Sequence, residues 1–507
     1  MWLERSLLVS GISGILTMAW FNEYFNHPSN SLQGGLTASI QAGAFAGSLL
    51  TGAFLADRLG RRWTIILGSF IFTVGIAICT GANNIYALVA GRVINGLGNG
   101  CTAMMVPLWQ SETMPKEIRG RVISLQQCVI NFGILSSFLI QYGTSFIDSN
   151  ASWRLAFGLQ MLPTTALMLV MFLMPESPRW LIQKSRIEEA LKVLARVHSS
   201  GDSSDPYVLA EFEEIKATLE YERSLKKPNY FELLFSKTHG RRTFIGLGAQ
   251  FFQQAVGINS CLYYAPFLFQ QAGVGSTEAS LLSNVINGIV LNVVTLPNMY
   301  YLDTWGRRRP MVWGAVGMGI CMMLIGVLFK TLGHPTMDPE TNKVTFDFSN
   351  NLAAGKAVIA FLYLYVAAFA ISWATPAWVV PAEIFTMASR ARASSMTTAT
   401  NWFVNFWFAL YIPTALEKIS WKLYMIFFVI CMVAAVVVFL FQPETANRSL
   451  EDMSYMFKPE KTMWVFRDRD LTDVHPQFDT LNETKEKIEH GELDVKGTEI
   501  FHDEEKA

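Results

Sequence analysis

The sequence has little charge. Only 16% of its 507 residues are Asp, Glu, Lys or Arg, whereas 51% are hydrophobic, including 36 Phe and 14 Trp. This composition is too apolar for an ordinary soluble enzyme. The formal net charge of −1 says nothing about nucleic acid, and we expect no nucleic-acid partner. The composition predicts a membrane protein, with the lipid bilayer as its surroundings.

Cysteine and histidine are also scarce where chemistry would need them. The seven histidines all lie outside the long apolar runs, so no imidazole is placed to carry protons through a membrane. The cysteines lie within or beside those runs, which excludes a disulfide framework, and their spacing fits no metal site. No nucleophile and base pair is visible either. We therefore expect neither an enzyme nor a bound cofactor or metal. The six cysteines are Cys79, Cys101, Cys128, Cys261, Cys321 and Cys431.

The chain does contain twelve apolar runs, each closed by a short polar or basic cluster. A hydrocarbon core about 30 Å thick needs roughly 20 apolar residues per helix, and these runs approach or exceed that length. They predict an all-α membrane protein whose first helix is the weakest. The predicted spans are 3–21, 36–56, 63–82, 85–109, 122–144, 153–174, 243–271, 278–301, 311–332, 354–381, 395–413 and 420–441.

Basic residues gather after alternate spans, whereas the intervening connections carry almost no Lys or Arg. The positive-inside rule then predicts that both termini are cytoplasmic. We expect a multi-pass integral membrane protein, in the plasma membrane. The clusters are Arg58, Arg61 and Arg62; Lys116, Arg119 and Arg121; Arg241 and Arg242; Arg307, Arg308 and Arg309; Arg390 and Arg392.

Three short signatures occur twice in the same order, which indicates an internal repeat. The interval between the first two signatures is about 25 residues longer in the second half, where the polar stretch 333–351 forms an insertion. Repeats in the same orientation predict two six-helix bundles related by an axis along the membrane normal, with a substrate site between them. The signatures are Asp57-Arg-Leu-Gly-Arg-Arg62 and its copy from Asp303, Glu112 with Arg119 and its copy Glu383 with Arg390, and Pro175-Glu-Ser and its copy from Pro443.

The repeat divides the chain into four predicted regions. Residues 1–182 form the first six-helix bundle and residues 241–442 the second. Residues 183–240 are polar and contain apolar residues at helical spacing, which predicts a cytoplasmic helical linker. Residues 443–507 form a cytoplasmic tail, which is charged and weakly periodic from about residue 455, so we expect it to be flexible.

In this order, the motifs resemble those of the sugar porter family of the major facilitator superfamily, closest to its fungal branch. The resemblance implies the major facilitator fold, and a carrier that moves a sugar, either a mono- or a disaccharide, by alternating access. The motifs are Asp57-Arg-Leu-Gly-Arg-Arg62, Arg92-Val-Ile-Asn-Gly-Leu-Gly98, Pro175-Glu-Ser-Pro-Arg-Trp180, Gln253-Gln-Ala-Val-Gly-Ile-Asn259 followed by Tyr263-Tyr264, and Asn401-Trp402 with Asn405.

Amides in the seventh span are the candidate sugar ligands. Sugar hydroxyls need both donors and acceptors, which neutral amides supply without burying a charge. On an unbroken helix Gln253, Gln254 and Asn259 would not share one stripe, so we expect Gly257 to loosen the helix and let them converge. The alternative is that such amides only join membrane helices. By resemblance, Gln127, Trp378, Asn401 and Trp402 complete the site, and Tyr263 and Tyr264 form the outer gate.

The repeated charged signatures are the candidate inner gate. Their carboxylates and guanidinium groups can lock neighbouring helix ends, although the arginines could also serve only to set the topology. By resemblance, the inner-gate residues are Asp57, Arg61, Glu112, Arg119, Asp303, Arg307, Glu383 and Arg390. The sequence departs from the family in the eighth span, where Leu291 stands at the usual position of an Asn and Asn292 follows it. We therefore do not expect Asn292 to be a ligand.

Arg92 is the one charge well inside a predicted span, and such a charge is expected to be functional. No Asp, Glu or His lies near the middle of any span, which favours facilitated diffusion. In the proton-coupled relatives, an Asp of the first helix faces this arginine; here Leu8 stands at that position. Proton symport therefore stays an alternative, and we expect the amino terminus to be truncated or mis-spliced.

Two further alternatives stay open. A carrier for polyols, inositol or quinate-type acids fits the same architecture, although a carboxylate substrate would want another cation beside Arg92. A sugar sensor that does not transport is the other; such receptors carry a long signalling tail, whereas this tail is short. The expected partners are thus a small sugar, the bilayer and, for a symporter, protons.

Overall fold

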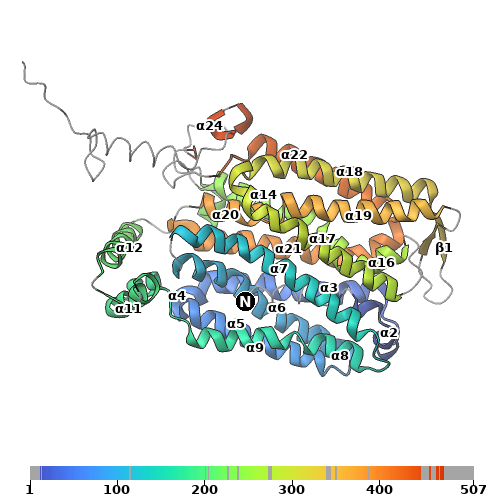
Figure 1. The fold of residues 1–507 in the computed structure, drawn as a ribbon, viewed down its shortest axis with the longest axis horizontal. Coiled ribbons are helices and arrows are strands. Elements are labelled where there is room, and N and C mark those ends of the chain that lie inside the picture. Colours follow the sequence, from blue (N-terminus) through green and yellow to red (C-terminus); the bar gives the residue numbers. More distant parts are fainter. Residues whose placement is uncertain are drawn as a thin grey trace, which may run out of the picture.

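The computed structural model shows long helices that run side by side along one direction (Figure 1). In the same view, α11 and α12 lie at one end of the helices and strand β1 lies at the other. The residues that the structure describes are 12, 14–113, 116–199, 201–203, 205–224, 228–236, 239–271, 277–337, 344–348, 351–385, 387–446, 456–457, 464–467 and 469–472.

Most of the first predicted span lies outside the described residues. Only the end of the predicted span 3–21 lies within the described residues, as the 3-10 helix η1 and the helix α2. The π-helix η2 continues α3 into α4. The elements are η1 (Ile15–Thr17), α2 (Ala19–Tyr24), α3 (Asn30–Leu50), η2 (Thr51–Leu55), α4 (Ala56–Leu59), α5 (Arg61–Thr80), α6 (Ile85–Thr113), α7 (Lys116–Thr144), α8 (Ala151–Gly158) and α9 (Met161–Leu173).

Four shorter helices follow before the second half. They are α10 (Pro178–Gln183), α11 (Ile187–His198), α12 (Pro206–Ser224) and α13 (Tyr230–Phe235). Their own small core contains Leu194 of α11 and Val208 of α12, packed against Trp180 of α10. Asn229 caps α13, because its side chain accepts from the backbone N–H of Glu232 while the Glu232 carboxylate accepts from that of Asn229.

The second half contains two interrupted helices. One is broken at Gly257 and the other between Ser372 and Pro376. The elements are α14 (Gly240–Ala255), α15 (Ile258–Tyr263), α16 (Ala265–Gln271), α17 (Thr277–Trp305), α18 (Arg308–Leu332), β1 (His334–Met337), β2 (Val344–Asp347), α19 (Leu352–Ser372), α20 (Pro376–Ile384), α21 (Met387–Ile419), α22 (Lys422–Phe441), η3 (Val465–Arg467) and α24 (Arg469–Thr472).

Six segments of the described chain are long and apolar enough to cross a membrane, judged by length and composition. Other predicted spans fall on helices with buried amides or basic residues, such as α3 with Gln41 and α21 with Asn401, which lower their hydropathy. The six segments are Arg61–Thr80, Ala151–Leu173, Ala279–Pro297, Arg308–Leu332, Ala353–Ile384 and Lys422–Phe441.

Two details differ from the sequence-based expectation. The insertion within 333–351 forms an antiparallel hairpin of β1 and β2, in which His334 pairs with Asp347. The tail was expected to be flexible from about residue 455, but part of it packs on the helices. Met456, Phe457 and Leu471 belong to one buried apolar cluster with Ile384 at the end of α20. The tail is mostly charged, so these few apolar residues gave no pattern from which packing could be predicted.

Candidate functional site

The break at Gly257 gathers the amides of the seventh predicted span. Gly257 has a φ of +98°, a left-handed conformation that favours glycine, and it separates α14 from α15. The predicted interruption is thus confirmed. It lets Asn259 Nδ2 of α15 donate to the side-chain Oε1 of Gln254 at the end of α14. The side chain of Gln254 also lies 3.5 Å from that of Gln253.

Asn401 of α21 is the centre of this amide cluster. Its Nδ2 donates to Gln250 Oε1 at 2.6 Å and to Gln253 Oε1 at 2.8 Å, and its Oδ1 accepts from Gln254 Nε2 at 3.0 Å. The side chain is only 2% exposed. The structure therefore joins four predicted ligands, Gln253, Gln254, Asn259 and Asn401, into one buried hydrogen-bond network.

The second helix break supplies acceptors to the same network. A helix end leaves carbonyl groups without intrahelical partners, and Gln253 Nε2 lies 3.2 Å from both the Trp373 and Ala374 carbonyl oxygens at the end of α19. Gln250 Nε2 donates to the Ala377 carbonyl oxygen at 2.8 Å. The sequence analysis missed Gln250, although it lies one turn before Gln253 and Gln254 and so shares their face.

The remaining predicted ligands lie elsewhere on the helices. Gln127 of α7 donates to Asn131 Oδ1 at 3.2 Å, and Asn131 donates to Thr295 of α17 at 2.7 Å. Trp402 is buried on α21 and packs with Ala44 of α3 and with α6. Trp378 is half-buried on α20, directly after the Ala377 carbonyl that Gln250 binds.

Asn292 donates to two backbone carbonyls. Its Nδ2 donates to the backbone carbonyls of Asn131 at 2.8 Å and of Gly288 at 2.9 Å. Leu291, which stands at the position where the family usually has an Asn, is buried in the main apolar core. Asn131 is also the partner of Gln127, and the expectation that Asn292 is not a ligand stays a prediction.

The predicted outer-gate tyrosines join the two halves of the chain. The Tyr263 hydroxyl accepts from Asn405 Nδ2 of α21 at 3.0 Å and lies 3.2 Å from the side-chain amide of Gln41 on α3. The Tyr264 hydroxyl donates to the Ala409 carbonyl of α21 at 2.8 Å. The sequence analysis did not assign Gln41 a role, because its partner is 222 residues away.

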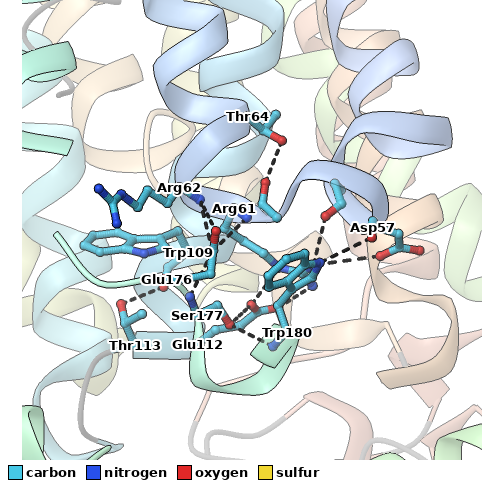
Figure 2. A network of polar contacts seen from close by, with 12 residues as sticks. Asp57, Arg61, Arg62, Thr64, Trp109, Glu112, Thr113, Glu176, Ser177 and Trp180 are labelled. Carbon is cyan, nitrogen blue, oxygen red and sulfur yellow. Dashed lines mark hydrogen bonds and ion pairs between the residues drawn. The ribbon is translucent and has the colours of Figure 1, made fainter. Parts of the chain in front are cut away.

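A charged network ties the helix ends of the first half (Figure 2). Arg61 binds the Glu112 carboxylate through two hydrogen bonds, of 2.8 and 3.0 Å, and its Nη1 lies 3.8 Å from Asp57. Ser177 Oγ donates to Glu112 at 2.5 Å. Glu176 accepts from the backbone N–H of Arg61 at 2.9 Å, so its carboxylate binds the positive N-terminal end of α5.

The second half repeats this arrangement. Glu444 accepts from the backbone N–H groups of Arg307 at 2.8 Å and Arg308 at 3.0 Å, at the start of α18. Arg307 Nη2 donates to Glu383 at 3.1 Å, and Thr445 Oγ1 donates to the other Glu383 oxygen at 2.5 Å. The three repeated signatures thus form equivalent networks, in which Glu176 and Glu444 cap a helix, a role that sequence reasoning did not assign.

Glycine is required where each network begins. Gly60 has a φ of +88° and Gly306 a φ of +80°. A Cβ on Gly60 would also lie 2.5 Å from Glu176 Oε2. Both glycines therefore let the backbone turn sharply against a carboxylate.

The structure describes the remaining predicted gate residues only in part. The side chains of Arg119 and Asp303 lie outside the described residues. The Arg390 guanidinium donates to the Phe385 carbonyl at 3.4 Å, at the junction of α20 and α21. Glu112 and Glu383 each bind the arginine of the Gly-Arg-Arg turn in their own half.

Arg92 is buried on α6, as expected for a charge inside a span. Its Nε donates to the Leu36 carbonyl of α3 at 2.8 Å, while its Nη2 has no hydrogen-bond partner within the described part of the chain. Its charge interacts with Cys79, Tyr263 and Tyr264 among the described residues. Arg92 therefore lies close to the tyrosines that join the two halves.

Comparison with known proteins gives consistent results. A family model described as "Sugar (and other) transporter" matches residues 9–457. An MFS glucose transporter of Aspergillus flavus is 39% identical over 467 residues, which cover 90% of this chain and 87% of the relative. A quinate permease of Neurospora africana is 34% identical over 437 residues, 84% of this chain and 80% of the relative. The solved proton:xylose symporter XylE, bound to 6-bromo-6-deoxy-D-glucose, has a TM-score of 0.73 and 27% identity; the match covers 90% of this chain and 98% of XylE.

Proposed function

We propose that this chain carries a sugar across a membrane by alternating access. The premise is that the chain belongs to the sugar porter family of the major facilitator superfamily. The similarity to XylE over 90% of the chain confirms the predicted all-α fold of that superfamily. The protein is therefore a multi-pass integral membrane protein.

The amide network around Asn401 carries the proposal. It is buried, electrically neutral and rich in both donors and acceptors, which suits hydroxyl groups. The network also connects α14 and α21 to the break between α19 and α20. A change in the backbone conformation at this break would therefore alter the amide network. The proposed binding residues are Gln127, Gln253, Gln254, Asn259, Trp378, Asn401 and Trp402.

Two groups of residues are proposed as the outer and inner gates. We propose Tyr263 and Tyr264 as the outer gate, since the Tyr263 hydroxyl joins α3 of the first half to α21 of the second, and the Tyr264 hydroxyl binds α21 beside it. The charged networks form the proposed inner gate, with Asp57, Arg61, Glu112, Arg119, Asp303, Arg307, Glu383 and Arg390. Interactions that form in one state and break in the other allow a rocking carrier to alternate.

Arg92 is the proposed coupling residue. Among the described residues Nη2 has no partner. A carboxylate opposite it would create a proton-sensitive pair, whereas an arginine bonded to a backbone carbonyl alone would suit a passive carrier. Facilitated diffusion and proton symport are therefore the two modes to separate by experiment.

We further propose the plasma membrane, with both termini cytoplasmic. The basic clusters at alternate connections support this orientation. Sealed vesicles of known orientation test it: a protease on the cytoplasmic face should remove epitopes at both ends, and protection of either end would contradict the proposal.

Uptake measurements test the function directly. In a host that lacks its own hexose carriers, we expect the chain to support saturable uptake of labelled glucose or xylose. Asn401→Ala should reduce it by at least about tenfold, because several buried amides lose a shared partner. A surface variant that reaches the membrane equally, such as Tyr86→Phe, serves as the control. Absence of uptake with intact sugar binding would instead identify a sensor.

Two further arms of this experiment separate the alternatives. Addition of a protonophore should abolish accumulation by a symporter and leave equilibrating uptake by a passive carrier unchanged. Competition by myo-inositol or quinate, rather than by hexoses and pentoses, would contradict a sugar substrate.

A further inference from the structure

The buried amide of Asn99 has no assigned role. Asn99 lies on α6, its side chain is 0% exposed, and neither its Oδ1 nor its Nδ2 has a hydrogen-bond partner among the residues that the structure describes. A buried polar group without a partner costs free energy, and folded proteins rarely retain one without a reason. The amide therefore points to a partner that is not part of the described chain.

Helix geometry fixes the direction in which Asn99 faces. At about 100° per residue, Asn99 lies within about 20° of Arg92 and about 40° of Ala103 around the axis of α6. Arg92 binds a carbonyl of α3 and interacts with Tyr263, and Ala103 packs with Trp402 of α21. Asn99 thus shares a stripe whose two ends both meet the second half of the chain.

The neighbouring helices fix its depth. A Cβ added to Gly96 of α6 would contact the backbone of Ile40 of α3, and one added to Gly100 would contact that of Ala44. Asn99 is therefore level with the residues just before Ala44 on α3.

Contacts of α3 with α21 show which residues of α21 lie at the same level. Ala44 packs with Trp402, and the ring of Phe45 lies 5.9 Å from that of Phe403. The segment from Asn401 to Asn405 contains both the centre of the amide cluster and the partner of Tyr263. Asn99 lies at this level, on the opposite half of the chain.

We propose that Asn99 is a further sugar-binding residue, which supplies a hydroxyl ligand from the first half opposite the amide cluster of the second half. This proposal rests on the proposed function of sugar transport. A carboxamide has an acceptor oxygen and two N–H donors, so it can accept a hydrogen bond from a sugar hydroxyl and also donate one to it. A ligand held from both halves favours the state in which the halves close around it.

The test replaces the amide by an apolar side chain of similar size, Asn99→Leu. We expect the KM for sugar uptake to rise about five- to tenfold, the usual effect of losing one hydrogen bond to a ligand. The melting temperature of the purified protein should stay the same or rise, because an unpartnered buried amide is removed. A merely structural amide would give the opposite pattern, with lower stability and unchanged KM.

A matched control lies on the same helix. Thr102 is buried, but its hydroxyl donates to the carbonyls of Gly98 and Asn99 within α6. Thr102→Val should therefore leave the KM unchanged. If Asn99→Leu does not reach the membrane, Asn99→Ala provides the same comparison with a smaller side chain.

Deoxy sugars identify the hydroxyl. For one monodeoxyglucose, which lacks the hydroxyl that Asn99 binds, wild type and Asn99→Leu should have equal KM values, whereas the other analogues should keep the full difference. An unchanged KM in both Asn99 variants, or the same loss with every analogue, would overturn the inference alone. A wild-type chain that neither binds nor transports any sugar would overturn the proposed function, and this inference with it.

Discussion

At the scale of single residues, Gln250 links the amide cluster around Asn401 to a missing hydrogen bond in α20. Pro381 lies inside α20 and has no N–H, so the Ala377 carbonyl four residues earlier lacks its helical partner. Gln250 Nε2 donates to this carbonyl, and Gln250 Oε1 accepts from Asn401. One side chain therefore satisfies the backbone of α20 and also orients the central amide.

Gln250→Leu should separate these two contributions. It leaves the Ala377 carbonyl unpaired, at a cost of about 1–3 kcal/mol, and frees one side of Asn401. We expect a lower melting temperature and a several-fold higher KM for sugar. Adding Pro381→Ala restores an N–H to Ala377, so the double variant should recover stability but not KM.

The control for this pair is Phe251→Leu, because Phe251 is 44% exposed on the outer side of α14. It should change neither quantity. If Pro381→Ala failed to restore any stability to Gln250→Leu, the helix-defect explanation would be wrong.

At the scale of elements, the C-terminal strap (residues 456–457, 464–467 and 469–472) fastens the helix ends of the second half. The guanidinium groups of Arg241 and Arg242, at the start of α14, lie 5.4 and 4.9 Å from the Phe457 ring centre. The Leu471 carbonyl accepts from the backbone N–H of Glu444 at 2.8 Å. The strap therefore contacts the segment that caps α18.

Phe457→Ala should loosen this strap. Phe457 is 4% exposed, so truncation removes a buried ring and leaves two arginines without their aromatic partner. A loss of about 3–5 kcal/mol is typical for a buried Phe and should appear as faster proteolysis of the tail. Phe466→Ala is the control, since Phe466 is 38% exposed. Equal cleavage rates in the two variants would argue against Phe457 as the anchor.

Some of these structural features could be predicted from the sequence and others could not. Local chemistry predicted the interruption at Gly257, because glycine is the residue that tolerates the left-handed conformation found there. Pattern matching also indicated amides in the seventh span. It picked out Glu176 in a repeated signature but not its role, because the bond from Glu176 to the start of α5 joins positions 115 residues apart, and it missed the anchors of the strap. Contacts of this kind depend on tertiary packing, which leaves no periodic signal in the chain.

At the scale of the whole molecule, the charged networks hold each half separately in this conformation. Arg61, Glu112 and Ser177 bind one another within the first half, and Arg307, Glu383 and Thr445 within the second. Through these hydrogen bonds, each network clamps the helix ends of its own bundle. Two rigid bundles are what alternating access requires, since the halves must rock without deforming.

The bonds described above for the two networks lie in separate halves, so the networks should contribute independently to stability. We expect the melting-temperature shifts of Glu112→Gln and Glu383→Gln to add in the double variant, because distant sites usually combine within about 0.3–0.5 kcal/mol. Glu112→Gln with Ser177→Ala provides the positive control: these two residues share a hydrogen bond of 2.5 Å, so their shifts should not add. If the Glu112 and Glu383 variants were coupled as strongly as this control pair, the two networks would act as one device across the halves, and the inner gate would already be closed in the conformation described here.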